Sequence, residues 1–267
     1  MRPFGRGCQV PLGRQLVLVA VFVAVAFSGP RVLAAATGPI WAKAAVRITV
    51  ECETGVAHPV QRILAPGGAL ALEFSCRQVS GDVQTLHAQL VRGDGTTTPI
   101  ELAVGNAFWR PEEVLWAPDS RSFLINGSEN AYAGFALLVC RVETDAVEVS
   151  EPTGLAQRDM VRRFPPCRAT NLDKRECARM EEHPQFNMSG LAWTRGGAAL
   201  VVFAEVPCSS FYGGIMCQVE GYEVDSKTGK ILTRWTAHEM KNDWQKAAAW
   251  DIRIPPAPDY GLSRTRK

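Results

Sequence analysis

Short runs of alternating apolar and polar residues dominate the chain after residue 45. VRITVECE at residues 46–53 has β-branched residues at alternate positions, which is typical of a half-buried β-strand. ILAPGGALALEFSCRQV at residues 63–79 has an apolar start, a Pro-Gly-Gly turn and a second alternating run. Residues 85–104 continue with strand, Arg-Gly-Asp-Gly turn and strand, because Asp-Gly favours a tight hairpin. The pattern predicts an all-β fold.

The stretch WAPDSRSFLIN, residues 116–126, combines a tryptophan, a tight turn and an apolar run. Pro118 presets the first angle of the turn, and the side chain of Asp119 can accept backbone N–H groups there. The short apolar run at residues 123–125 is typical of a strand covered on both faces. We interpret the stretch as a strand end, a hairpin turn and a core strand. Trp116 is then a packing residue that buries roughly 150–250 Å².

A second stretch of the chain repeats this one. Shifting the sequence by 77 positions places Trp116 on Trp193 and Cys140 on Cys217, and it places the apolar run 123–125 on residues 200–202. The stretch from Leu64 shares the turn and the apolar run but has leucine in place of tryptophan. The sequence therefore predicts three related sheet units, two of them closely similar.

The two ends of such a unit resemble known motifs. Trp116 to Ser120, Trp-Ala-Pro-Asp-Ser, is similar to the W-S-P-D-G pattern of the TolB-like and WD40-like bacterial β-propeller families, and Asp225 to Lys230 is similar to their D-x-x-T-G-K pattern. The resemblance implies a propeller-like fold of about four to five blade-like antiparallel sheets, which need not close into a ring. It also implies that Trp116, Pro118, Asp119 and Trp193 are structural blade residues. A β-sandwich is the alternative fold.

The N-terminal 36 residues differ from the rest of the chain. Arg2, Arg6 and Arg14 precede an uncharged apolar run at 16–29 and a small-residue site at 32–36, which together are typical of a cleaved secretory signal peptide. We therefore expect a periplasmic or secreted protein with no stable membrane span after cleavage. Removing residues 1–36 takes away four arginines and leaves 25 basic and 27 acidic residues, a net charge of −2. This balance does not favour a nucleic-acid partner.

Seven cysteines follow the signal segment, and an exported protein lies where disulfides persist. The candidates for disulfides are those near one another in the chain: Cys52 with Cys76, Cys167 with Cys177, and Cys208 with Cys217. Cys140 is the odd one, in an apolar strand, where a buried thiol is unremarkable. Connectivity does not follow from sequence, so these pairs are hypotheses.

The expected domain runs from residue 44 to 254, with an insertion at 154–187 and a loose tail at 255–267. The insertion is dense in charge and proline, and we expect one short helix there, capped by Asn171 with Asp173 in its first turn. Residues 238–250 predict a short helix and residues 251–254 a last strand.

Motifs of known chemistry are scarce in the sequence. It holds no paired histidines at helical spacing, no G-x-S-x-G, no P-loop and no G-x-G-x-x-G, so we predict no catalytic residues, no metal and no cofactor. The favoured function is an exported binding or scaffold protein of a bacterial cell envelope, with an unknown protein or small-molecule ligand. The alternatives are a secreted hydrolase that uses His183 with Asp173, Glu181 or Glu182, and an inhibitor whose loop is closed by Cys167 and Cys177.

Overall fold

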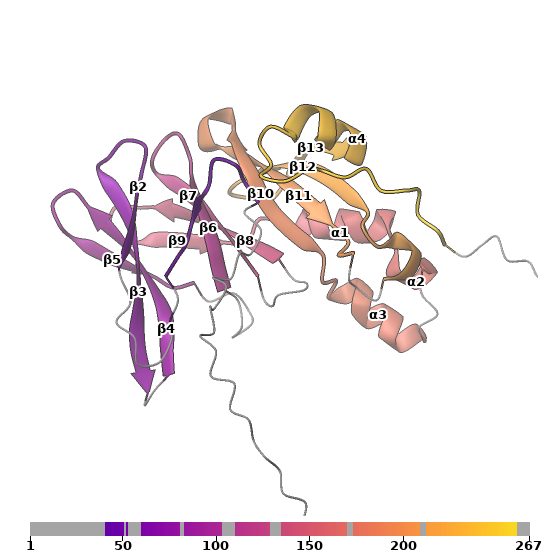
Figure 1. The fold of residues 1–267 in the computed structure, drawn as a ribbon, viewed down its shortest axis with the longest axis horizontal. Coiled ribbons are helices and arrows are strands. Elements are labelled where there is room, and N and C mark those ends of the chain that lie inside the picture. The colour runs from indigo at the N-terminus through magenta and orange to yellow at the C-terminus, as the bar shows by residue number, and fades with distance from the viewer. Residues whose placement is uncertain are drawn as a thin grey trace, which may run out of the picture. The chain divides into compact units, whose positions relative to one another are not determined.

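The computed structural model describes residues 41–50, 52, 60–80, 83–102, 110–128, 135–169, 173–208 and 212–260 (Figure 1). Residues 38–267 form one compact unit. The expected signal peptide at 1–36 and the end of the expected tail, 261–267, lie outside the described residues.

The described residues form three antiparallel sheets, and neighbouring strands follow one another in the chain except where β1 lies beside β6. The first sheet comprises β2 (Gln61–Leu64), β3 (Leu70–Ser80), β4 (Val83–Arg92) and β5 (Thr97–Ile100). The second comprises β6 (Arg110–Trp116), β7 (Ser122–Ser128), β8 (Phe135–Val142) and β9 (Val147–Ser150), with β1 (Val46–Arg47) beside β6. The third comprises β10 (Asn187–Thr194), β11 (Ala199–Glu205), β12 (Val219–Asp225) and β13 (Ile231–Thr236).

The all-β class is therefore confirmed. The described sheets number three rather than the expected four to five, and they do not show a closed ring. Apart from β1, each sheet is an up-and-down meander, since each strand pairs with the next one along the chain. In the first sheet the expected hairpin joins β4 and β5 through residues 93–96.

The hairpin between β6 and β7 has the form that the sequence predicted. Trp116 pairs with Phe123 at the end of the ladder, and the Ala117 N–H donates to the Ser122 carbonyl at 2.8 Å. Asp119 Oδ1 accepts the N–H groups of Arg121 and Ser122, at 2.8 and 3.1 Å. The proposed role of Asp119 as a turn acceptor is confirmed.

Strand β7 is buried along its whole length. Phe123 and Ile125 pack with residues of the first sheet, while Leu124 between them packs with residues of the third. This alternation follows from the two-residue period of a strand. The interpretation of residues 123–125 as a strand covered on both faces is confirmed.

The repeat at an offset of 77 is present in two strands of each unit. Strands β6 and β10 begin 77 residues apart, as do β7 and β11, and Trp193 pairs with Leu200 as Trp116 pairs with Phe123. The third strand breaks the offset. Cys140 pairs with Phe123, but Val224 pairs with Leu200, so Val224 is the true equivalent of Cys140 and the match of Cys140 with Cys217 is wrong. The reason is the connection from β11 to β12, residues 206–218, which is about twice as long as residues 129–134.

The insertion is helical. It forms α1 (Gly154–Arg163), α2 (Pro166–Ala169) and α3 (Lys174–Glu182). Helix α3 is the one that the sequence predicted, but its N-cap is Asp173, which accepts the N–H groups of Arg175 and Glu176. The prediction of Asn171 as the cap is therefore wrong, and Asn171 itself lies outside the described residues.

Helix α1 was missed because its charged residues conceal its apolar side. Ala156, Met160 and Phe164 are spaced four residues apart and are buried against the second and third sheets. This spacing is typical of an amphipathic helix. The helix thus covers the sheets rather than standing apart as a loop.

The C-terminal region is more ordered than expected. Helix α4 (Ala237–Glu239) begins at a capping box formed by Thr236 and Glu239, and the π-helical turn η3 (Met240–Trp244) follows it. The predicted strand at 251–254 is absent, because the Ile252 N–H donates to the Gln245 side chain instead of a neighbouring strand.

The beginning of the expected loose tail is held against the domain by hydrogen bonds. The Pro256 carbonyl accepts from the Gln218 amide at 2.8 Å, and the Asp259 N–H donates to the Gly214 carbonyl at 2.9 Å. The Tyr260 hydroxyl donates to the Arg163 carbonyl at 3.2 Å. Hydrogen bonds thus hold residues 256–260 to the domain, whereas the sequence predicted a loose tail from residue 255.

The cysteines pair as hypothesised. Disulfides join Cys52 to Cys76, Cys167 to Cys177 and Cys208 to Cys217, and Cys140 is a buried free thiol. Burial raises the pKa of the Cys140 thiol far above its ordinary range, so this group stays protonated and inert. Three disulfides are consistent with an oxidising, extracytoplasmic compartment.

Candidate functional site

A cleft of about 470 Å³ lies where the tryptophan-bearing ends of the second and third sheets meet. Its walls come from four parts of the chain: the segment before β1, the end of β6, the end of β10 and the segment after η3. The lining residues are Lys43, Ala44, Leu115, Trp116, Pro118, Leu191, Ala192, Trp193, Lys246 and Ala247. Most of these side chains are apolar, and two are cationic.

The two indoles occupy equivalent positions but are held differently. The Trp193 Nε1–H donates to the Leu115 carbonyl at 3.0 Å, a hydrogen bond that crosses from the third sheet to the second. Trp116 packs against Phe123 with ring centroids 4.8 Å apart, and its Nε1–H has no acceptor among the described residues. One indole therefore ties the two sheets together, and the other contributes a packing surface.

A buried polar network joins the same two sheets further along the strands. Asn126 on β7 donates to Glu113 Oε1 at 2.6 Å and to the Gly190 carbonyl at 2.9 Å, and its Oδ1 accepts the Gly190 N–H at 2.7 Å. The Asn126 amide thus pairs with the Gly190 backbone as a neighbouring peptide group would. The ladder from β10 to β11 is irregular between Gly190 and Ala192, and the Asn126 amide bonds to the Gly190 backbone at this irregularity.

The fully buried Glu113 carboxylate also anchors the segment that begins the described chain. It accepts the N–H groups of Trp41 and Ala42, at 2.8 and 3.0 Å. Burial raises the pKa of Glu113, and the hydrogen bonds from Asn126 and from these two N–H groups oppose that rise. The Glu113 side chain of the second sheet therefore fixes the segment before β1, which forms one wall of the cleft.

The two lysines of the cleft come from opposite ends of the domain. The Lys43 N–H donates to the Ala247 carbonyl at 2.8 Å, and Ala42 forms a β-bridge with Ala248. Because this bridge is short and antiparallel, it holds Lys43 and Lys246 on one rim. Both lysines are exposed, and neither forms an ion pair within the described part of the chain.

The charged side chains of the cleft are its two lysines. The lining has no carboxylate, histidine, thiol or hydroxyl side chain, so the ammonium groups of Lys43 and Lys246 are its charged groups. An apolar floor with cations at the rim matches a ligand that has an apolar body and one anionic group. The lining gives no ligand set for a metal or a cofactor.

Three of the four residues to which the resemblance assigned a structural role lie together in this lining. Trp116, Pro118 and Trp193 line the cleft, while Asp119 serves the turn beside it. The sequence identified these residues as packing groups but did not indicate a cleft. It also missed Lys43 and Lys246, because only the bridge between residues 42 and 248 brings them together.

The residues of the alternative hydrolase site are not assembled. Asp173 caps the beginning of α3, whereas His183 follows its end with an exposed imidazole, so they lie at opposite ends of the helix. Glu182 approaches His183 to 3.9 Å, and both side chains are about three-quarters exposed, at 74% and 77%. Glu181 is also exposed. Exposed, flexible groups of this kind do not preorganise a reaction.

Helix α1 contributes a charged cluster against the third sheet. Glu220 on β12 is buried and lies 2.9 Å from Arg163, and the buried Tyr222 donates to Asp159 at 3.2 Å. Burial raises the pKa of Glu220, and the nearby Arg163 opposes that rise. Since each member has a partner within the cluster, we interpret it as the means by which α1 is fixed to the sheet.

Two further surveys concern the described residues only. They include no group of three or more histidine, cysteine, aspartate or glutamate side chains that could hold a metal ion. None of their helices has the length and apolarity needed to cross a bilayer.

The fold and the cleft define an all-β protein of three antiparallel sheets with a largely apolar cleft that two lysines line. Comparison with protein-family models gave no match, and a search of curated proteins found no similar sequence.

Proposed function

We propose that this chain is an exported, propeller-like binding protein of a bacterial cell envelope and that its cleft binds a small amphipathic anion. In this proposal each of the three described sheets is one blade. The three blades form an open array, because a closed ring usually needs four to eight blades. The cleft at the tryptophan-bearing ends of the second and third sheets carries the proposal, because it combines two indoles with two lysines that have no ion-pair partner in the described chain.

The ligand class follows from the lining. An apolar body would replace water against Trp116, Leu191 and Trp193, and burial of apolar surface is the main source of affinity in such clefts. The anionic group would lie at the rim beside Lys43 and Lys246. Because both ammonium groups are solvated, we expect them to set the choice of an anion over a neutral analogue more than the total affinity.

The test is a titration with dodecanoate, and with dodecanol as its neutral analogue, followed by tryptophan fluorescence. We expect saturable binding of dodecanoate, and about tenfold weaker binding in the double variant Lys43→Gln, Lys246→Gln, which removes two rim charges. Dodecanol binding should not change in that variant. The matched control is Lys227→Gln, Lys230→Gln, which removes the same charge at exposed positions after β12.

Two results would contradict the proposal. One is the absence of saturable binding of dodecanoate and also of naphthoate, an aromatic anion that tests the same cleft with a rigid body. The other is binding that weakens equally in the two double variants, since the anion would then respond to net charge rather than to the rim of the cleft. Trp116→Phe assigns the fluorescence change to the cleft, because its indole lines it.

A further inference from the structure

The three disulfides differ in the exposure of their cysteine residues. Cys208 is exposed, whereas Cys52, Cys76, Cys167 and Cys217 are half-buried and Cys177 is buried. Attack by a thiolate on a disulfide requires access to a sulfur atom, and exposed disulfides are the ones most often labile or catalytic. The Cys208–Cys217 bridge is therefore the accessible one among the three.

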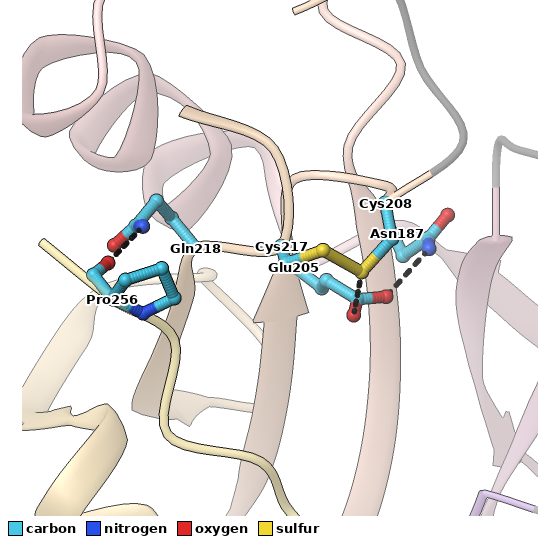
Figure 2. Close-up of a disulfide and its surroundings, with 6 residues drawn as sticks. All are labelled: Asn187, Glu205, Cys208, Cys217, Gln218 and Pro256. Atoms are coloured by element: carbon cyan, nitrogen blue, oxygen red, sulfur yellow. Dashed lines mark hydrogen bonds between the residues drawn. A yellow bond between two sulfur atoms is a disulfide. The ribbon is translucent and has the colours of Figure 1, made fainter. Parts of the chain in front are cut away.

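A carboxylate lies beside the exposed sulfur. Figure 2 shows Glu205, the last residue of β11, between Cys208 and Asn187. Its Oε1 lies 3.7 Å from Cys208 Sγ, and its Oε2 accepts from the Asn187 amide at 3.0 Å. Asn187 is itself buried, so it fixes the carboxylate with one oxygen turned toward the sulfur.

The bridge can open without loss of the sheet that carries it. Residues 206 and 217–218 continue the β11–β12 ladder, with hydrogen bonds of 2.9 Å from the Cys217 N–H to the Val206 carbonyl and from the Val206 N–H to the Gln218 carbonyl. Gln218 is also tied to Pro256. These bonds hold the two cysteines near each other when the sulfur–sulfur bond is broken.

The backbone at Cys217 is unusual for a cysteine. Its φ is +65°, in the left-handed region that residues other than glycine, asparagine and aspartate rarely adopt. Such conformations persist where the surrounding structure imposes them, and they are enriched at functional sites. The disulfide-closed connection is one constraint of this kind.

We propose that Cys208–Cys217 is a thiol–disulfide exchange site, that Cys208 is the sulfur attacked by a partner thiolate, and that Glu205 transfers the proton at Cys208. This activity is independent of ligand binding in the cleft. The partner is a low-molecular-weight thiol or a protein dithiol in the same compartment.

The partner supplies the two electrons that reduce the Cys208–Cys217 disulfide. A partner thiolate forms a bond to Cys208 Sγ, the Cys208–Cys217 bond breaks, and its electron pair leaves on Cys217, which takes a proton from water. A second partner thiolate then attacks the partner's sulfur in the mixed disulfide, and the Cys208 thiolate leaves and receives the Glu205 proton. Two partner thiols are oxidised to one disulfide while the Cys208–Cys217 bridge is reduced to two thiols. The reverse reaction closes the bridge, with Glu205 accepting the Cys208 proton.

The surroundings of Glu205 favour the protonated form of its carboxyl. Burial raises the pKa of its carboxyl, while the Asn187 hydrogen bond and the charge of Arg253, from the segment after η3, oppose that rise. These are the groups that face it, together with Cys208 itself. A carboxyl with a raised pKa is a better proton donor to a departing thiolate than an ordinary surface carboxylate.

The first experiment treats the folded, oxidised protein with reduced glutathione, traps free thiols with N-ethylmaleimide and measures each cysteine by peptide mass spectrometry. We expect Cys208–Cys217 to open about tenfold faster or more than the other two bridges, with glutathione attached to Cys208 and a free thiol at Cys217. Equal opening of the three bridges, or attachment of glutathione to Cys217 instead, would overturn the proposal.

The second experiment tests Glu205 through the reoxidation of the reduced protein by glutathione disulfide. Glu205→Gln keeps the shape of the side chain, and we expect it to slow closure about tenfold at pH 7 and to have no effect above about pH 9, where the thiol ionises unaided. The control is Glu176→Gln, which changes an exposed carboxyl next to Cys177. A loss that is the same at both pH values would indicate a structural role and would refute the proton transfer. If Glu205→Gln does not fold, the ranking of the wild-type bridges still decides the proposal.

Discussion

The second and third sheets are built alike in their first two strands and differently afterwards. Strand β11 begins and ends 77 residues after β7. Trp116 and Trp193 occupy equivalent positions, because Trp116 pairs with Phe123 and Trp193 pairs with Leu200. Each of these central strands alternates its side chains between two buried clusters. The shared part therefore consists of the positions that the packing of one sheet against its neighbours requires.

The first difference lies at the joint between the two sheets. Asn126 bonds to Glu113 on β6 and to the backbone of Gly190 on β10. By register Glu113 corresponds to Ser189 and Gly190 to Val114, because the irregularity of the first strand pair lies between Pro111 and Glu113 in the second sheet and between Gly190 and Ala192 in the third. A Cβ atom at Gly190 would lie 2.6 Å from Leu124 Cδ2, so a larger residue would force the Leu124 side chain to move. One unit thus supplies a carboxylate and the other a bare backbone, and the joint depends on this asymmetry.

The second difference lies in the connection to the third strand. The connection at residues 206–218 of the third unit is about twice as long as the equivalent connection of the second, and it carries Cys208 and Cys217. The exchange site that we propose lies wholly in this extra segment and the strand end before it. Departures from a repeat are where chemistry can be added without disturbing the packing that the repeat provides.

The largest expected effect comes from breaking the joint. Glu113→Ala leaves two backbone N–H groups and the Asn126 amide without their acceptor inside the protein, and we expect the free energy of unfolding to fall by about 3–5 kcal/mol in urea. Glu113→Gln keeps part of the acceptor and should lose about half as much.

The control for this change is Glu148→Ala on β9 of the same sheet. The Glu148 side chain is 54% exposed and lies 3.9 Å from Arg141, so its loss should be within about 0.5 kcal/mol of neutral. Equal losses in Glu113→Ala and Glu148→Ala would show that the buried network does not hold the sheets together.

A smaller effect is expected from Glu223 on β12, at a position where β8 of the second sheet has a valine. Glu223 pairs with Val201 in the third sheet, where the second sheet has Val139 opposite Leu124. Hydrogen bonds from Arg195, Thr194 and Thr233 lower the pKa of Glu223 to about 2. Because the folded pKa lies below the ordinary value of 4.5, Glu223 contributes stability above about pH 4.5 that is lost as the pH falls toward 2.

We expect this contribution to be about 1–2 kcal/mol, since the Arg195 partner is more than half exposed. The measurement is the difference in unfolding free energy between the wild type and Glu223→Gln from pH 2 to pH 6. Taking the difference cancels groups such as Glu113, whose raised pKa makes its contribution decline with rising pH. A difference that does not change over this range would contradict the assigned pKa.

The sequence predicted what local chemistry determines. The turn at Asp119, the buried strand at 123–125, the three disulfide pairs and the all-β class all follow from short patterns or from proximity along the chain. Cysteines 9 to 24 residues apart close loops easily in an exported chain, which explains why nearest-neighbour pairing succeeded here.

The sequence did not predict what distant segments create together. Lys43 reaches the cleft because Ala42 bridges to Ala248, and Glu113 matters because residues 41–42 return to it. The false match of Cys140 with Cys217 has the same origin, since a single constant offset does not account for the longer connection between β11 and β12. These features depend on tertiary contacts that leave no local pattern.

The smallest expected effect compares the two indoles directly. Phenylalanine keeps most of the apolar ring and removes the N–H, so Trp193→Phe deprives the Leu115 carbonyl of its donor while Trp116→Phe removes a group with no acceptor in the described chain. We expect Trp193→Phe to lower the free energy of unfolding by about 1 kcal/mol more than Trp116→Phe, the usual value of one hydrogen bond. The double variant should show additive losses, because the two rings pack against different clusters. Equal losses in the single variants would mean that the hydrogen bond from Trp193 to Leu115 does not help to hold the second and third sheets together. The two tryptophans would then contribute equally to stability as well as occupying equivalent positions.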